Sequence, residues 1–192
     1  LTVLDVHIFT SRRVMAISFA IGNQSYTIFK VHFTPSYNTA ESFIDFCNDL
    51  STVENELTEI TSSCFIIGGD FNVNAAHRNH HRWLELQLWC SKLNLTIPSV
   101  TFLPDYSFTF VSPVHNTTSW LDHYCITSNI VDQVNDIEIH HDYSTSDHMP
   151  ISMTIKLNDG GAVTVREEPT SSEFRVCHLW DKATEQDISR YR

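Results

Sequence analysis

The sequence lacks several patterns that would assign a chain of 192 residues to a familiar class. No apolar run is long enough to span a membrane, and no signal peptide opens the chain. The five cysteines are an odd number without a Cys-x-x-Cys pair, which argues against a disulfide scaffold and predicts reduced thiols in an intracellular protein. The eleven histidines include no His-x-x-x-His pattern beside a carboxylate, which argues against a zinc site.

Basic residues are also scarce. Lysine and arginine number 12 against 23 aspartates and glutamates, so the formal net charge is -11. Proteins that bind nucleic acid through bulk charge usually present a basic face, and this balance argues against that mode. It does not exclude an enzyme that contacts a few phosphates locally. The length fits one domain, and the 42% of hydrophobic residues can form a sizeable core.

Alternating apolar and β-branched residues predict a chain rich in strands. The predicted strands cover residues 3–9, 14–20, 25–33, 63–67, 106–111, 122–127, 134–140 and 149–157. Apolar residues at helical spacing predict helices over 40–50 and 83–93, and Ser51 with Glu54 forms a capping box that would open a further helix. The pattern predicts an α+β fold, a two-layered antiparallel β-sandwich flanked by helices.

The domain organisation is predicted from composition. Residues 1–157 form the domain, and residues 158–172 form a linker containing Gly160-Gly161. Residues 173–192 place apolar side chains on one helical stripe and are predicted to start a helical connector toward a downstream region. The first residue, Leu1, is not a methionine and already belongs to a strand-like run, so we expect the chain to be a piece of a longer protein.

Three short polar motifs follow or open predicted strands. They are Gly68-Gly69-Asp70-Phe71-Asn72, Ser119-Trp120-Leu121-Asp122-His123 and Ser146-Asp147-His148-Met149-Pro150. Together they supply three carboxylates, an amide and an imidazole at points that a sheet can bring together. Carboxylates hold a hard divalent cation, an amide contacts a phosphate oxygen, and an imidazole activates water. The ordered set therefore predicts metal-assisted hydrolysis of a phosphodiester.

Each motif also has a simpler interpretation. Asp70 and Asn72 could cap backbone groups in a turn, and the third motif could be the exposed polar start of a strand. In the functional interpretation, Asp147 contacts the metal and His148 is the general base. A histidine base needs a partner that fixes its tautomer, and Asp122 is the best candidate. The neighbouring His123 is predicted to be a strand or surface histidine.

In this order, the motifs resemble the endonuclease/exonuclease/phosphatase family, whose fold is that of deoxyribonuclease I. The closer resemblance is to the endonuclease domain of non-LTR (LINE-type) retrotransposons. It rests on residues 11–14, 26–37, 66–73, 120–123 and 145–150. The tail Trp180-Asp181-Lys182-Ala183 resembles the connector that precedes the reverse transcriptase in such elements.

The resemblance implies a monomeric, non-membrane domain that nicks DNA with Mg²⁺, or Mn²⁺ in its place. It also implies a nuclear location and a reverse transcriptase tethered downstream. Carried over residue by residue, the resemblance implies that Asp70 orients or protonates a group at the reacting phosphate and contacts the metal. It implies that Asn72 contacts the phosphate. Asp122 orients His148, Asp147 contributes to the metal site, and His148 activates the attacking water.

Two departures from the family pattern weaken this expectation. Family members carry N-terminal strands with an early Asn and a Glu that is the main metal ligand, and neither has a counterpart here. The family tyrosine two residues before the loop proline is replaced by Phe33, while His32 is expected to face the other side of the strand. We therefore predict that this chain alone binds metal poorly and cleaves little or nothing. A phosphoesterase acting on small phosphate esters or phosphoinositides, and a non-catalytic relic of the fold, stay open as alternatives.

Overall fold

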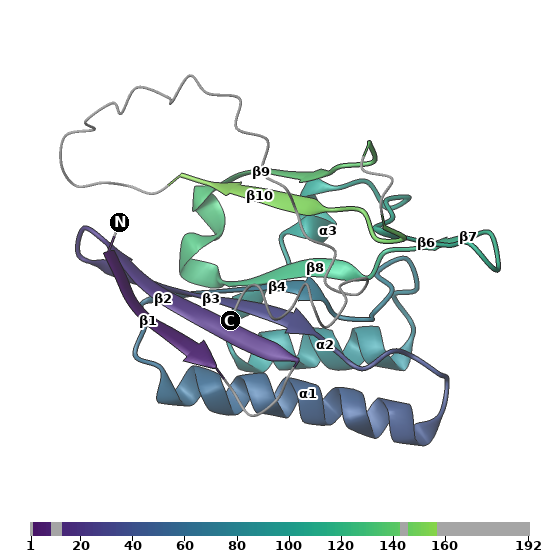
Figure 1. Cartoon of the computed structure of the whole chain (residues 1–192), viewed down its shortest axis with the longest axis horizontal. Helices are drawn as coiled ribbons and strands as arrows, with labels where there is room; N and C mark the ends of the chain where they lie inside the picture. The colour runs from purple at the N-terminus through teal and green to yellow at the C-terminus, as the bar shows by residue number, and fades with distance from the viewer. Residues whose placement is uncertain (1, 9–12, 143–145, 157–192) are drawn as a thin grey trace, which may run out of the picture. The chain divides into compact units, whose positions relative to one another are not determined.

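A six-stranded sheet forms the centre of the fold. The computed structural model describes residues 2–8, 13–142 and 146–156 (Figure 1). The strands are ordered β1 (Thr2–Ile8), β2 (Val14–Ile21), β3 (Gln24–His32), β4 (Cys64–Asp70), β8 (Asp122–Thr127) and β5 (Leu95–Thr96). Neighbouring strands are antiparallel except β3 and β4, which are parallel. The parallel pair follows from the crossover helix α1 (Ala40–Glu59) that connects the two strands.

A second, smaller sheet covers part of one face of the central sheet. It pairs β9 (Val134–Ile139) with β10 (Ile151–Ile155), and the 3₁₀ helix η1 (Ser128–Gln133) leads into it. Buried side chains from both layers fill the space between them; they are Tyr26, Cys64, Ile66, Ile126, Ile130, Val134 and Ile137. These two packed sheets, with helices outside them, agree with the predicted α+β sandwich.

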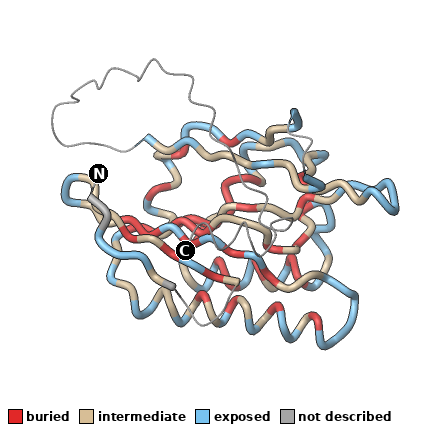
Figure 2. Tube along the Cα trace, in the orientation of Figure 1, coloured by how far each residue is buried: buried red, intermediate tan, exposed pale blue. Residues whose placement is uncertain are grey.

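The opposite face of the central sheet packs against helices α1 and α2 (His81–Lys92). Alternation along β3 explains this burial, because Phe29 and Val31 point to the helices and are fully buried. Figure 2 shows the same pattern as red segments where the strands and helices face one another. The main core therefore lies between the sheet and the two helices.

Some element boundaries differ from the prediction. Helix α1 is continuous, and the predicted capping box is wrong because the Ser51 hydroxyl donates to the carbonyl of Cys47 inside the helix. The helix instead begins after Thr39, whose hydroxyl accepts from the backbone N–H of Ser42. The predicted strand 106–111 is mostly turn and contributes only the start of a hairpin. That hairpin pairs β6 (Phe110–Ser112) with β7 (Thr117–Ser119).

Short elements between α2 and β6 were not predicted, namely β5 and helix α3 (Ser99–Phe102). The predicted linker and connector, residues 158–192, lie outside the described residues. None of the described helices is both long and apolar enough to cross a membrane.

Candidate active site

Two of the motif carboxylates meet through strand pairing. Asp70 ends β4 and Asp122 begins β8, and the two residues are direct partners in the antiparallel register. Side chains of opposite residues in such a pair lie on the same face of the sheet. The buried run at the start of β4 fixes this register, because a slip by one residue would move apolar side chains out of the core. The sheet thus places two carboxylates together, with side chains only 15% and 14% exposed.

The two glycines before Asp70 allow the strands to approach closely. Gly69 has φ of 143°, and a Cβ atom there would lie 2.1 Å from the carbonyl oxygen of Val31 on β3. A Cβ atom on Gly68 would lie 2.7 Å from the ring of Tyr124. The pair is therefore required by packing around the end of β4.

His148 completes a carboxylate–imidazole pair. Its Nδ1 atom lies 2.9 Å from Oδ2 of Asp122, and its Nε2 atom lies 3.9 Å from Oδ2 of Asp70. The hydrogen bond to Asp122 raises the pKa of His148, and partial burial opposes this effect. Because a neutral imidazole bonded in this way donates from Nδ1, its Nε2 atom remains free to accept a proton. The arrangement is that of a general base with an orienting carboxylate.

A buried threonine holds Asp122 and His148 in place. The hydroxyl of Thr109 accepts from the backbone N–H groups of Leu121 and Asp122, both at 3.0 Å. Its carbonyl accepts from the N–H of Met149 at 2.7 Å, so one residue ties the second motif to the third. Thr109 is fully buried. No local sequence pattern indicates this role, because hydrogen bonds to distant backbone groups leave none.

Asn72 is bonded closely to Asp70. Its backbone N–H donates to Oδ1 of Asp70 at 2.8 Å, and its Nδ2 atom donates to Oδ2 at 2.9 Å and to the carbonyl of Phe33 at 2.9 Å. Its φ of 51° is in the left-handed region, which asparagine tolerates. Both amide hydrogens are used within the protein, so contact with a phosphate would replace one of these bonds. Burial is the main reason that the pKa of Asp70 is raised.

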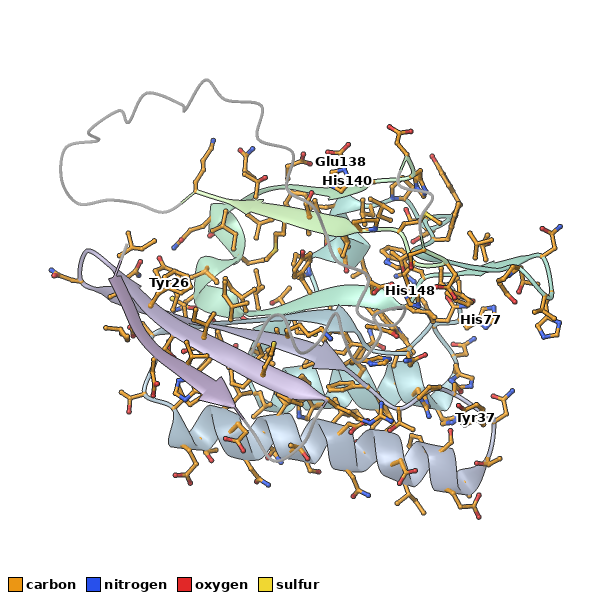
Figure 3. The ribbon with its side chains drawn as sticks, in the orientation of Figure 1. Tyr26, Tyr37, His77, Glu138, His140 and His148 are labelled. Atoms are coloured by element: carbon orange, nitrogen blue, oxygen red, sulfur yellow. The ribbon has the colours of Figure 1, made fainter. Side chains whose placement is uncertain are left out.

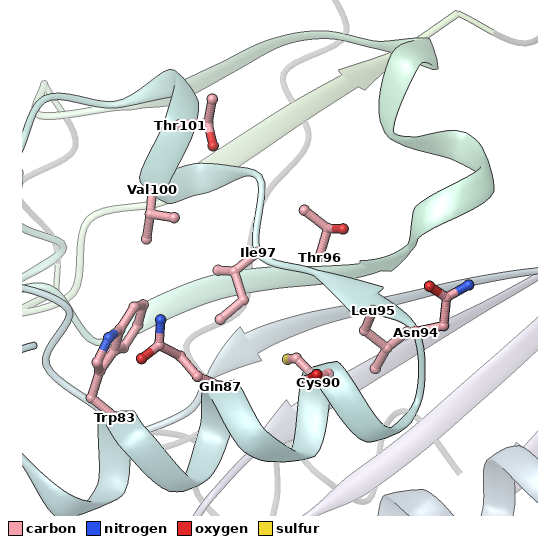
Figure 4. A pocket seen from close by; sticks show the side chains of 10 residues that line it. Trp83, Gln87, Cys90, Asn94, Leu95, Thr96, Ile97, Val100 and Thr101 are labelled. Carbon is pink, nitrogen blue, oxygen red and sulfur yellow. The ribbon is translucent and has the colours of Figure 1, made fainter.

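A pocket of about 360 Å³ opens beside these residues. Its walls are Pro35, Ser36, Asn38, Asn72, Asn74, His77, His80, Phe110, Ser119, Leu121 and His148. Figure 3 labels His148 and His77 at the same end of the molecule. A second cavity of about 410 Å³ lies between α2 and β5 and is lined by Trp83, Gln87 and Cys90 among others (Figure 4). No residue of the predicted site lines this second cavity, so the chemistry belongs to the first pocket.

Comparison with known families places this geometry in context. The model of a family described as endonuclease-reverse transcriptase matches residues 26–152, about two thirds of the chain, and this range includes all three motifs. The chain belongs to the endonuclease-reverse transcriptase family. A search of curated proteins gives no match for the sequence.

Solved structures similar to this family member share its fold. The 3'-5' exonuclease NExo from Neisseria meningitidis is 17% identical, with a TM-score of 0.63 over 81% of this chain and 72% of that one. The endonuclease domain of TRAS1, a telomere-specific non-LTR retrotransposon, is 20% identical, with a TM-score of 0.60 over 80% and 69%. The catalytic domain of Xenopus laevis APE2 is 16% identical, with a TM-score of 0.58 over 75% and 55%. Together they establish the deoxyribonuclease I-like fold.

His32 of this endonuclease-reverse transcriptase chain faces the opposite side of the strand from Phe33, as predicted, but that is the side on which the site lies. Phe33 is fully buried and packs edge-to-face against Phe46 and Phe71. His32 instead pairs with Asp70 in the parallel register, and its Nε2 atom lies 3.7 Å from Oδ2 of that carboxylate. Alternation along β3 explains the difference, because adjacent residues face opposite sides of the sheet. His32 was therefore missed as a residue at the edge of the site.

His123 lies on strand β8 as predicted, but it is fully buried rather than at the surface. Its Nε2 atom lies 2.8 Å from the carbonyl oxygen of Val73, and the Trp83 and Trp120 rings pack against it. Burial lowers the pKa of His123, which keeps the imidazole neutral. The role of His123 is structural.

Asp147 lies apart from the other carboxylates. Its side chain is exposed and accepts from the Ser146 hydroxyl at 3.3 Å, while its backbone carbonyl accepts from the N–H of Val111. Its charge contributes only weakly to the raised pKa of His148, after Asp122 and Asp70. Among the described residues, no three His, Cys, Asp or Glu side chains lie close enough together to hold a metal ion.

Proposed function

We propose that this chain is a DNA endonuclease domain of a retroelement, which nicks a phosphodiester so that a tethered reverse transcriptase can use the cut strand. The observation that carries this proposal is the Asp122–His148–Asp70 arrangement at the pocket of an endonuclease-reverse transcriptase family member. The acidic net charge of -11 implies that binding depends on local contacts and not on a broad basic surface.

The geometry supports a hydrolysis in which each group has one task. His148 takes a proton from water at Nε2 while the water oxygen forms a bond to phosphorus. Asp122 stabilises the imidazolium that results. The bond from phosphorus to the leaving oxygen breaks, and Asp70 gives that oxygen a proton, a task that suits its raised pKa. Asn72 holds Asp70 and offers its amide to a phosphate oxygen.

We also propose Mg²⁺, or Mn²⁺ in its place, as the cofactor. Asp147 and the ionised form of Asp70 would hold it, so the cation and the proton compete for Asp70, and Mg²⁺ commonly binds one or two carboxylates and keeps several waters. When bound, the cation neutralises charge on the phosphate. Because the described residues do not gather three ligands, we propose that the chain alone binds the cation weakly and cleaves little or no DNA.

Nicking of supercoiled plasmid with Mg²⁺ or Mn²⁺ tests the proposal. We expect little nicking by the chain alone, and any metal-dependent nicking that is measured should fall by about 10²–10⁴-fold in His148→Ala and fall in Asp147→Ala. The matched control is His140→Ala, which removes an imidazole bonded to Ser152 on β10, outside the pocket. Equal nicking by wild type and His148→Ala would refute the assigned base. Hydrolysis of a phosphoinositide or an aryl phosphate without nicking would instead favour a phosphoesterase, and no reaction with any substrate would favour a relic.

The same proposal extends to the setting of the activity. Its substrate would be host DNA in the nucleus, and the domain would act as a monomer linked to the reverse transcriptase. Size-exclusion chromatography with light scattering tests the monomer, and a dimer at micromolar concentration would contradict it.

A further inference from the structure

The active-site pocket continues beyond His148 to a wall made by the loop before α2. His77 and His80 line this wall, together with Asn38 and Asn74. The pocket volume of about 360 Å³ lies within the range of sites for small ligands. A single phosphate at His148 would therefore leave room for a further group at the histidine wall.

Basic side chains lie close together at this wall, although the chain as a whole is acidic. Burial lowers the pKa of His80 first, and the positive charges of His81, Arg82 and His77 lower it further. The His80 and His81 rings lie 4.0 Å apart, and no acidic group acts on His80 to oppose the effect. Because its pKa is lowered, His80 is neutral near pH 7, so the wall offers an anion uncharged N–H donors close to the charge of the Arg82 guanidinium.

The two histidines also offer free hydrogen-bond donors. His80 caps helix α2, because its Nδ1 atom accepts from the N–H of Arg82 at 3.4 Å. The proton of the neutral ring is therefore on Nε2, which has no partner among the described residues. The exposed His77 side chain likewise makes no hydrogen bond or ion pair within the described part of the chain. Asn74 uses its Oδ1 atom for two backbone N–H groups, which leaves its amide hydrogens available.

We propose that the wall formed by His77 and His80 binds a second phosphodiester group, next to the one held at His148. The inference rests on the proposed function and narrows it. A polynucleotide occupies both ends of the pocket, whereas an ester with a single phosphate occupies only the catalytic end. The wall therefore selects polynucleotides over small phosphate esters.

Binding without turnover tests the inference. Fluorescence anisotropy with a labelled DNA oligonucleotide is measured in EDTA at about pH 5, because the lowered pKa of His80 requires a pH well below the ordinary histidine value for that ring to be charged. The variant is His77→Gln with His80→Asn, since asparagine retains a helix cap without the imidazole. His140→Gln is the control. We expect the double variant to bind the oligonucleotide about 10-fold more weakly and with a salt dependence shallower by about one to two units of slope. Its affinity for a nucleoside monophosphate should not change.

The outcomes separate this inference from the function on which it rests. Thermal unfolding followed by circular dichroism verifies the fold of each variant, and His77→Gln alone disturbs no hydrogen bond of its side chain. If the wild type binds and nicks DNA and the double variant binds the oligonucleotide equally well, the inference that His77 and His80 bind a second phosphodiester is overturned. The endonuclease proposal then stands. An equal loss of affinity for the monophosphate would also overturn it. If the wild type neither binds nor nicks DNA, the proposed function fails, and the inference fails with it.

Discussion

Substitution of Arg82 should destabilise the loops around the active site. This arginine is 1% exposed, and its guanidinium donates to the carbonyl of Thr34 at 2.6 Å, of Pro35 at 3.1 Å and of Ser42 at 2.6 Å. It also reaches the carbonyl of Asn72 at 3.4 Å. One side chain thus joins the loop after β3, the first turn of α1 and the loop that carries Asn72.

The expected loss of folding free energy follows from the backbone carbonyls that lose the Arg82 donor. Arg82→Met retains similar length and apolar contact with the Phe46 ring but removes the guanidinium donor from three close carbonyls, of which that of Pro35 still accepts from the Ser42 hydroxyl at 3.4 Å. Each unsatisfied buried carbonyl costs about 1–3 kcal/mol, and water entering the gap recovers part of this loss. Removing the buried charge also returns some desolvation energy. We therefore expect the free energy of unfolding to fall by about 3 kcal/mol, a large share of the roughly 5–15 kcal/mol typical of a domain.

Urea unfolding followed by circular dichroism measures this loss. The control is Arg78→Met, because Arg78 is 50% exposed and pairs with an exposed Asp105, so its removal should cost less than about 1 kcal/mol. Arg82→Lys should be intermediate, since an ammonium retains the charge but cannot reproduce the planar fork of donors. If Arg82→Met and Arg78→Met unfold at the same urea concentration, the reasoning is refuted.

Four further predictions concern the site and its support. Asp122→Asn should lower the pKa of His148, so the rise of the nicking rate with pH should begin at lower pH. The maximum rate should fall by about 10²–10⁴-fold. A rise at an unchanged pH would contradict the pairing of Asp122 with His148. The pKa of His148 is raised in the folded state, so the Asp122–His148 pair should contribute its full stability below the ordinary histidine pKa of 6.5. This contribution should be lost as the pH rises through the raised pKa, which melting temperatures measured at several pH values would show. Gly69→Ala should lower the melting temperature, through about 2–4 kcal/mol of strain and displacement at Val31, and an unchanged melt would rule this out. Cys125 should resist alkylation in the folded protein at pH 8, because burial raises its thiol pKa, and rapid modification seen by mass spectrometry would disprove it.

Much of the site could be predicted because its parts sit at the ends of strands. The apolar run before Gly68 predicts a central strand, and the strand places Asp70 where the chain turns. The same argument applies to Asp122 on β8. Their meeting with His148 follows from local patterns in the expected order, together with the pairing rules of a sheet.

Other features could not be predicted, for physical reasons. Thr109 and Arg82 act through bonds to backbone carbonyls and N–H groups far along the chain, and those partners have no sequence signature. Ser51 matches a capping box, but the buried Leu50 and Val53 on either side of it favour an unbroken helix against the core. His32 was missed because the family tyrosine put the site on the Phe33 side of the strand, whereas Phe33 is buried and the site lies on the side that His32 faces.

The pairing of Asp70 with Asp122 also bears on how such a sequence can change over generations. Their spacing is set by backbone register, so the turn between β6 and β7 can lengthen without moving either carboxylate. A single inserted residue inside β4 or β8 would instead turn one carboxylate toward the helices and bring an apolar side chain to the pocket. Descendants of this chain should therefore accumulate length differences in the connections and tolerate none within these two strands.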